Sequence, residues 1–314
     1  MLTRDALIAS LTTLRRATIA GQRAPYKPLT LLWAIGRLGQ EGAPDRLTSL
    51  QQARDETSRI FRVYGRGGEH QVNPINPLWR LQGDCDGMLW ECSTTVPAVL
   101  TAEGIPSAAE LERLHAKFGF SEAAFDLLKS DAELRAQSAH LLAAQVCPLD
   151  MWEDLFEAVR LPLDASAEHI KFPISSSRTR EVARRVSRDP RFRSIVLDAY
   201  DGRCAICGTR PTVADKPFGV EAAHIRWVTE DGPDEIRNGL ALCVMHHRGL
   251  DRGAFTLTDG MQVEISPHLE RPNAADTDHF WRFAGVDIAM PARTVDRPLN
   301  EFVDWHRREV FRSA

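Results

Sequence analysis

Four residues with metal-ligand chemistry constrain the fold of this chain more than any other feature. Cys204 and Cys207 are separated by two residues, and Cys243 and His246 repeat this spacing further along the chain. Ligands at this spacing can both reach one tetrahedral ion across a tight turn. Three thiolates and one imidazole form a closed set that suits structural zinc. We therefore predict a domain built around one structural zinc ion.

Signals for membrane insertion or secretion are missing from the sequence pattern. No apolar run approaches the roughly 18 residues of a membrane span, and charged residues such as Arg4 and Arg15 interrupt the first segment. We expect a cytoplasmic, bacterial protein, in which cysteines stay reduced. The remaining cysteines have no partner at ligand spacing, and we interpret them as core or turn residues: Cys85, Cys92 and Cys147.

Charge is unevenly distributed along the 314 residues, whose formal net charge is –4. Residues 1–80 hold 12 basic and 6 acidic side chains, residues 81–170 hold 5 and 16, and residues 171–193 hold 8 and 2. A local basic surface matters more for nucleic-acid binding than the mean charge does. The seven arginines of residues 178–193 predict a phosphate-contacting surface, although a solvated helix face is the alternative. The arginines proposed to contact DNA are Arg178, Arg184, Arg185 and Arg188.

The hydrophobic and turn patterns predict an α+β protein of two domains. The Pro- and Ser-containing segment 162–177 is the expected linker between domain 1–161 and domain 178–314. In the first domain, three helices followed by a hairpin suggest a winged-helix-like, mainly helical arrangement. The helices are expected over residues 3–20, 28–38, 47–64, 107–118, 121–129 and 131–146, and the hairpin over 79–82 and 88–92. The second domain is expected to hold a helix over 190–200, a hairpin over 255–265 and a final helix over 298–311.

Three polar residues lie inside the metal-ligand frame: His224, Asn238 and His247. Each of them alone is compatible with a structural role. Together with the cysteine pairs, however, they resemble the HNH nucleases of the ββα-metal fold over about residues 195–265. The motifs that carry the resemblance are CAIC, AAHI, RNGLALC and VMHHRGLDRG, in that order.

This resemblance implies hydrolysis of DNA phosphodiester bonds with 5′-phosphate and 3′-hydroxyl products. His224 would be the general base, since a neutral imidazole can take a proton from water near pH 7. His247 would bind one divalent ion, Mg²⁺ or Mn²⁺, that neutralises phosphate charge. Asn238 would hold the loop that aims His224 at the water.

One position departs from the pattern of the HNH family. Many relatives place a second metal ligand immediately before the general base, where this chain has Ala223. Asp251 lies four residues after His247 and shares its helix face. Glu221 lies two residues before Ala223 and shares its strand face. Either carboxylate is a candidate second ligand, and each also has a plain structural interpretation.

Segments 24–33 and 73–82 resemble the DNA sulfur-binding domain, which in its family precedes an HNH module in type IV restriction enzymes. The resemblance implies a double-stranded DNA partner that carries a phosphorothioate. A shallow apolar depression next to basic side chains would recognise the sulfur atom. Relatives often carry His at the position of Tyr26 and Tyr at that of Asn76. Trp79 is also a plausible core anchor. The expected DNA-contacting residues are Tyr26, Lys27, Pro28, Asn76, Pro77, Trp79 and Arg80, with His70 as a weaker candidate.

The leading hypothesis is a phosphorothioate-dependent endonuclease that restricts modified foreign DNA. Two alternatives remain open: an HNH enzyme that reads a methylated base or a short sequence, and a zinc-stabilised DNA-binding protein with an inactive site. Because one HNH site cuts one strand, a homodimer is expected. The C-terminal helix, with Val310 and Phe311, is a candidate interface.

Overall fold

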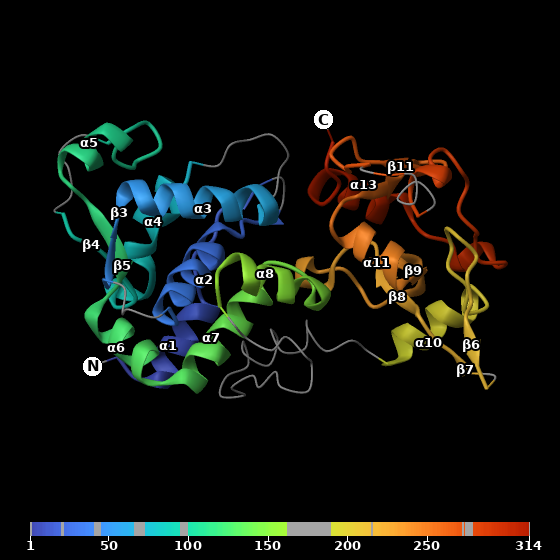
Figure 1. Ribbon diagram of the computed structural model, residues 1–314, viewed down its shortest axis with the longest axis horizontal. Helices are drawn as coiled ribbons and strands as arrows, with labels where there is room; N and C mark the ends of the chain where they lie inside the picture. The colour runs from blue at the N-terminus through green and yellow to red at the C-terminus, as the bar shows by residue number, and fades with distance from the viewer. Residues whose placement is uncertain are drawn as a thin grey trace. The chain divides into compact units, whose positions relative to one another are not determined.

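The computed structural model describes residues 2–19, 22–40, 45–65, 73–94, 100–161, 190–214, 216–271, 273 and 279–313. The described residues form two compact units, the first within residues 2–161 and the second within residues 190–313 (Figure 1). No described helix is long and apolar enough to cross a membrane. The expected linker 162–177 lies outside the described residues, as do His70, Arg178, Arg184, Arg185 and Arg188.

The first unit is mainly helical. Its elements are α1 (Arg4–Thr12), β1 (Thr18–Ile19), β2 (Gln22–Arg23), α2 (Tyr26–Leu38), β3 (Leu47–Ser49), α3 (Leu50–Tyr64), α4 (Ile75–Arg80), β4 (Trp90–Cys92), α5 (Ala108–Arg113), β5 (Lys117–Phe120), α6 (Glu122–Ser130), α7 (Ala132–Ala143) and α8 (Trp152–Ala158). The apolar helix α2 is the centre of this unit, because residues all around it are buried and it packs against α3, α4 and α7. Its near-continuous apolar sequence explains this central place.

The predicted hairpin in the first unit is wrong. Residues 79–82 continue α4 into a 3₁₀ segment, Leu81–Gly87, and only β4 is a strand. Pro74 and Pro77 fit the first turn of a helix, where a missing N–H costs nothing. β4 instead pairs with β5, which also pairs with β3, so that three antiparallel strands lie in the order β3-β5-β4. The winged-helix-like arrangement is therefore not confirmed.

Three helix boundaries in the first unit differ from the expectation. The helix that begins after Thr3 ends at Thr12, because the chain turns into the short β1–β2 hairpin. The third helix begins at Leu50, since the three residues before it pair with β5 and Ser49 caps the helix by accepting from the Gln52 N–H. The helix expected over 107–118 ends at Arg113, and β5 follows it.

The second unit is built around one antiparallel hairpin followed by a helix. Its elements are α10 (Pro190–Ala199), β6 (Thr212–Val213), β7 (Lys216–Pro217), β8 (Val220–His224), β9 (Gly239–Cys243), α11 (Val244–Asp251), β10 (Phe255–Leu257), β11 (Val263–Ile265) and α13 (Asn300–Glu309). β8 pairs with β9, and both α10 and α11 pack on this pair (Figure 1). The helix, hairpin and final helix predicted here are confirmed.

Gly239 allows α10 to approach the start of β9 closely. A Cβ atom at this position would lie 2.4 Å from Cγ2 of Val196, which is closer than real Cβ atoms come to a neighbour. Gly239 is also the register partner of His224, the last residue of β8. The absence of a side chain at Gly239 therefore lets α10 pack beside His224, the candidate general base.

The C-terminal helix packs back on the second unit. Val310 and Phe311 are 3% and 8% exposed, so the expectation that they belong to a dimer interface is wrong. They pack on Gly253, where a Cβ atom would lie 2.0 Å from the carbonyl oxygen of Val310. Its φ of +68° is also a conformation that favours glycine. The chain end thus closes the core of its own unit.

His306 of α13 is a buried polar residue that joins three elements. Its Nδ1 accepts from the Thr256 hydroxyl at 2.8 Å, and its Nε2 donates to the Leu250 carbonyl at 2.9 Å. Burial lowers the pKa of His306 to about 4. The imidazole is therefore neutral in the folded unit at neutral pH.

We expect the second unit to lose stability as the pH falls. An unfolded histidine has a pKa of about 6.5, so the unfolded chain takes up a proton that the folded chain rejects. The stabilising contribution of neutral His306 is complete above about pH 6.5 and is lost progressively toward pH 4, by about 2 kcal/mol at pH 5. Unfolding of the full chain at pH 7.5 and pH 5 measures this loss. The His306→Gln variant should show a smaller difference between the two pH values; an unchanged difference would contradict the assignment.

Candidate metal centre and nuclease site

The four predicted zinc ligands lie together in the second unit. One ligand atom from each of Cys204, Cys207, Cys243 and His246 lies within 4.8 Å of the others. The His246 Nδ1 is 3.4 Å from the Cys204 sulfur and 3.1 Å from the Cys243 sulfur. The backbone places them there: the Ala205 N–H donates to the Ala241 carbonyl of β9 at 2.7 Å, which fixes the CAIC turn against the strand that ends in Cys243. This donor set fits a tetrahedral zinc ion.

His246 is oriented for coordination through Nδ1. Its Nε2 is 2.7 Å from the carbonyl oxygen of His279, so Nε2 carries the proton and Nδ1 keeps its lone pair toward the sulfurs. Burial lowers the pKa of His246, whereas hydrogen bonds with Cys204 and Cys207 raise it, and metal binding requires a deprotonated Nδ1. Hydrogen bonds from Cys207 and Cys243 lower the pKa of Cys204, which favours the thiolate form that binds metal.

His247, the next residue on α11, contacts both candidate carboxylates. Its Nδ1 is 2.7 Å from Oε2 of Glu221 on β8, and its Nε2 is 3.4 Å from Oδ2 of Asp251 on α11. The Trp227 indole N–H donates to the other Asp251 oxygen at 2.9 Å. The side chain of Asp251 is 3% exposed, whereas that of Glu221 is 40% exposed. The two carboxylates therefore hold opposite nitrogens of one ring, and Glu221 is on the side that solvent reaches.

His224 is the last residue of β8, and two residues hold its ring: one stacks on the face and the other contacts a ring nitrogen. The Phe192 ring of α10 stacks on the imidazole, with centroids 3.8 Å apart and planes at 10°. The Nε2 atom is 2.8 Å from Oδ1 of Asp234, whose side chain is 39% exposed, and the His224 side chain is 10% exposed. A carboxylate at Nε2 selects the tautomer in which the neutral ring keeps its lone pair on Nδ1.

Asn238 lies fully buried directly before β9, and its hydrogen bonds fix the loop after His224. Its side-chain oxygen accepts from the Arg226 N–H at 2.8 Å, and its amide nitrogen donates to the carbonyls of Arg226 and Pro233, each at 3.0 Å. The Asn238 carbonyl accepts from the Ile225 N–H at 2.9 Å. These four bonds hold both ends of the loop that carries Asp234.

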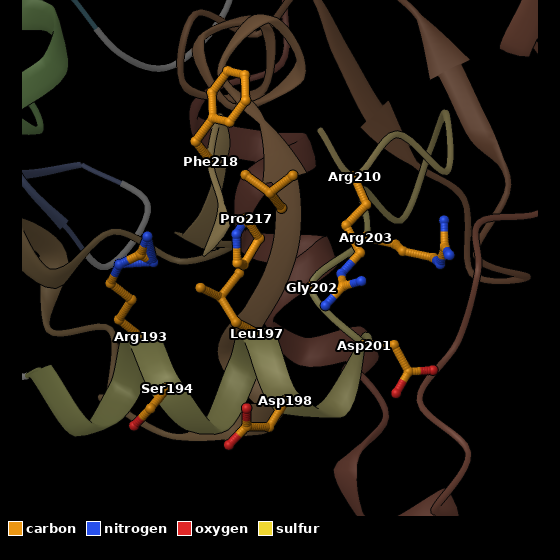
Figure 2. A pocket seen from close by; sticks show the side chains of 11 residues that line it. Arg193, Ser194, Leu197, Asp198, Asp201, Gly202, Arg203, Arg210, Pro217 and Phe218 are labelled. Carbon is orange, nitrogen blue, oxygen red and sulfur yellow. The ribbon is translucent and has the colours of Figure 1, made fainter. Parts of the chain in front are cut away.

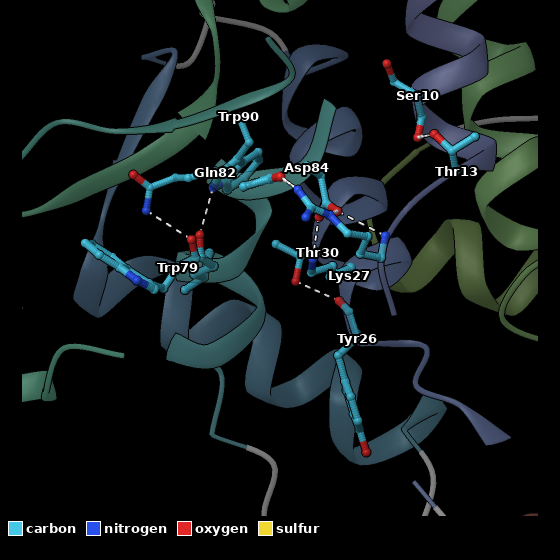
Figure 3. A network of polar contacts seen from close by, with 12 residues as sticks. Ser10, Thr13, Tyr26, Lys27, Thr30, Trp79, Gln82, Asp84 and Trp90 are labelled. Carbon is cyan, nitrogen blue, oxygen red and sulfur yellow. Dashed lines mark hydrogen bonds and ion pairs between the residues drawn. The ribbon is translucent and has the colours of Figure 1, made fainter. Parts of the chain in front are cut away.

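In the first unit, the residues expected from α2 are mostly inside the fold. Tyr26 is 6% exposed, and its ring meets that of Phe61 edge to face at 5.1 Å. Pro28 is buried in the first turn of α2. Lys27 forms an ion pair with Asp84, which is itself buried and also accepts from the Arg15 N–H at 3.0 Å (Figure 3). The Lys27 ammonium is thus engaged within the first unit.

The residues expected from α4 range from the core to the surface. Pro77 is buried, Asn76 and Trp79 are half-buried, and Arg80 is exposed, with its guanidinium 2.5 Å from the Glu103 carbonyl. α4 packs beside α2, so the two predicted motifs do lie on neighbouring helices. Trp90 of β4 is buried in the core nearby, and its indole donates to the Leu78 carbonyl at 2.9 Å (Figure 3).

Sequence reasoning missed three residues around these sites. Asp234 contacts His224 from a loop, and the sequence does not distinguish it from the three other acidic residues between His224 and Asn238. Trp227 donates to Asp251 across the unit, and Asp84 neutralises Lys27. Nothing in spacing or periodicity marks these pairings, because each joins segments whose approach depends on the whole fold.

Two family models match the chain in its two units. Residues 4–164 match the ScoMcrA-like, DNA sulfur-binding domain, and residues 204–258 match the HNH endonuclease family. No curated protein matches the chain. The two matches fall on the two compact units of the described residues.

Solved structures with similar chains include two DNA-bound domains and one endonuclease. The sulfur binding domain of ScoMcrA complexed with phosphorothioated DNA is 25% identical, with a TM-score of 0.39, over 49% of this chain and 94% of that one. The sulfur binding domain of SprMcrA complexed with phosphorothioated DNA is 23% identical, with a TM-score of 0.39, over 51% and 94%. The type IV phosphorothioation-dependent restriction endonuclease ScoMcrA is 16% identical, with a TM-score of 0.37, over 79% and 94%.

Proposed function

The chain belongs to the ScoMcrA-like DNA sulfur-binding domain family and carries an HNH endonuclease domain, and we propose that it cuts DNA in response to a phosphorothioate in the backbone. The HNH domain is that of a metal-dependent DNA endonuclease. The observation that carries the proposal is that a sulfur-binding family member continues into a unit with two ordered histidine sites, His224 with Asp234 and His247 with Glu221. The second unit therefore supplies the cutting and the first unit supplies the selection.

His224 acts as the general base in this proposal. Asp234 accepts the Nε2–H, so Nδ1 takes the proton from the attacking water and Asp234 stabilises the imidazolium that results. Stacking against Phe192 and the buried bonds of Asn238 keep the ring from rotating away. The water then attacks the phosphorus, and we expect 5′-phosphate and 3′-hydroxyl ends.

His247 and Glu221 form the site that fits a divalent cation, which when bound neutralises phosphate charge and stabilises the leaving oxygen. Their nitrogen and oxygen atoms are already adjacent at 2.7 Å, and the 40% exposure of Glu221 leaves room for phosphate and water. Asp251 holds the opposite nitrogen and is itself held by Trp227. We therefore assign Glu221 and His247 as ligands and Asp251 as the carboxylate that orients His247, as second carboxylates commonly do at metal sites.

Cys204, Cys207, Cys243 and His246 bind structural zinc in this proposal. The set is closed, since three sulfurs and one nitrogen fill a tetrahedron and leave no position for substrate. It also lies immediately before His247 in α11. Zinc there supports the helix that carries the cation site and takes no part in the reaction.

The first unit reads the sulfur atom through an apolar surface beside a cation. Sulfur at a non-bridging position is larger and less strongly hydrated than oxygen, so contact with apolar atoms favours it. The half-buried Trp79 and the exposed Arg80, which follow each other on α4, supply the apolar and the cationic contact in this proposal. Lys27 fixes the start of α2 through its ion pair with Asp84. In this proposal it supports DNA binding indirectly, by holding that part of the first unit in place.

We expect Trp79 and Arg80 to contribute differently to binding. With cleavage disabled by His224→Ala, Trp79→Ala should reduce the preference for a phosphorothioate duplex over its oxygen counterpart about tenfold, because apolar contact is lost. Arg80→Ala should weaken binding to both duplexes by one common factor and lower the salt dependence by about one counterion. Fluorescence anisotropy with the two duplexes measures both. No preference for sulfur in the parent chain would refute the proposed selection.

A further inference from the structure

A groove on the second unit lies outside the zinc cluster and the histidine sites, and among its lining arginines only Arg193 belongs to the arginine segment 178–193. It runs between α10 and the end of the β6–β7 hairpin, and it encloses about 780 Å³ (Figure 2). Its remaining wall is the turn that follows α10 and leads into the CAIC segment. This volume is within the range of roughly 300–1,000 Å³ that ligand clefts occupy.

Three arginines line this groove: Arg193 of α10, Arg203 of the turn, and Arg210. All three are exposed, and none of them forms an ion pair with another residue that the structure describes. The Arg210 side chain lies against the turn, since its Nε would be 3.2 Å from a Cβ placed on Gly202. Arg203 donates to the Gly208 carbonyl at 3.4 Å, and guanidinium groups without a carboxylate partner at a concave surface attract phosphate.

The floor between these cations is apolar. Figure 2 shows the guanidinium groups of Arg193 and Arg210 on either side of Pro217 and Leu197. Phe218 stands at the rim and is 55% exposed, an unusual exposure for a phenylalanine. Two carboxylates, Asp198 and Asp201, also line the groove; Figure 2 shows Asp198 on the side of α10 away from Pro217 and Asp201 beyond the end of the helix. Two guanidinium groups that can each bind a phosphate therefore lie on either side of an apolar surface, and a sugar or base can pack on that surface.

The groove is close to the catalytic candidate in the fold. Arg193 follows Phe192, whose ring stacks on His224. Val220 lines the groove and begins the strand that His224 ends. Four residues of strand span about 13 Å, which is the rise of about four nucleotides in one strand of duplex DNA.

We propose that this groove binds the sugar–phosphate backbone of the DNA a few nucleotides from the cleaved bond. Arg193 and Arg210 hold consecutive phosphates, and Phe218 packs on the sugar or base between them. Arg203 contributes from the far side of the turn. This rests on the proposed nuclease function and adds a binding site that serves both modified and unmodified DNA, because it contacts no sulfur.

The test compares two double variants of the full chain, both made in the His224→Ala background. Arg193→Ala/Arg210→Ala removes two groove charges, and Arg293→Ala/Arg308→Ala removes two exposed charges elsewhere on the second unit. Binding to an unmodified duplex is measured from 50 to 300 mM NaCl, and binding to its phosphorothioate counterpart is measured at one salt concentration. We expect the groove variant to lower the slope of log affinity against log salt by about 1.8, since each phosphate contact contributes about 0.9. The control variant should keep the parent slope.

Phe218→Ala separates packing from charge. It should weaken binding about fivefold and leave the salt slope unchanged, because no counterion is released by an aromatic ring. Equal slopes for the parent and the groove variant would overturn the proposal, and so would a change in oligomeric state caused by Phe218→Ala. A groove variant that loses only the preference for sulfur would also overturn it. Since the slopes come from unmodified DNA, failure of sulfur reading leaves this test intact.

Discussion

The His224→Ala variant is expected to cut DNA about a thousandfold more slowly than the wild-type chain, because a positioned general base contributes roughly 10²- to 10⁴-fold. Its zinc content and its affinity for DNA should stay unchanged, since His224 is not one of the four predicted zinc ligands and acts in the chemical step. Single-turnover cleavage of a labelled duplex measures the rate. His268→Ala, which removes an exposed histidine of the same unit, is the matched control and should keep full activity.

Asp234 is predicted to act through His224, as a residue that positions the general base. Asp234→Asn should slow cleavage about tenfold, because the amide no longer favours the tautomer with its lone pair on Nδ1. In the His224→Ala background the same substitution should cause no further loss, since the two groups act as one unit. Independent, multiplying losses in the double variant would show that Asp234 acts elsewhere.

Cys204→Ala is expected to abolish both zinc binding and cleavage while sulfur-dependent binding by the first unit persists. Structural zinc contributes about 10–16 kcal/mol in small zinc domains, which is as large as the total stability of a typical domain. The second unit should therefore unfold, with His247 and Glu221 no longer held together. Zinc per chain and calorimetric unfolding of the full chain measure the change: one of two transitions should disappear.

The matched control for this loss is Cys92→Ala, a half-buried cysteine of the first unit. It should retain one zinc per chain and normal cleavage. A Cys204→Ala chain that keeps its zinc and its second unfolding transition would contradict the assignment of the cluster as the scaffold of the nuclease unit.

The nuclease half could be predicted from sequence because its signals are local. Two CxxC-type spacings, a short strand ending in His224 and a helix beginning after Cys243 each depend on a few neighbouring residues. The structure places the four predicted zinc ligands together, and His247 follows the last of them on α11. The choice between Glu221 and Asp251 was open at the sequence level, since each shares a face with an expected ligand position. Only the fold shows that they hold opposite nitrogens of the same ring.

The first half was harder to predict because its strands pair over long distances. Trp90 and Phe120 face each other across β4 and β5 through a segment of about thirty residues, and no local pattern specifies that partner. The hairpin expected at residues 79–92 followed from an apparent turn at Gly83–Gly87, whereas Asp84 turns inward to meet Lys27. A buried ion pair of this kind cannot be read from either sequence position alone.

The central claim is that cutting by the second unit depends on a sulfur atom read by the first. Its most direct test is cleavage of two duplexes of identical sequence, one with a single phosphorothioate of the natural stereochemistry and one without, in Mg²⁺ and in Mn²⁺. We predict that the wild-type chain cuts only the sulfur-containing duplex and that the His224→Ala variant cuts neither. Equal cutting of both duplexes by the wild-type chain would contradict the account.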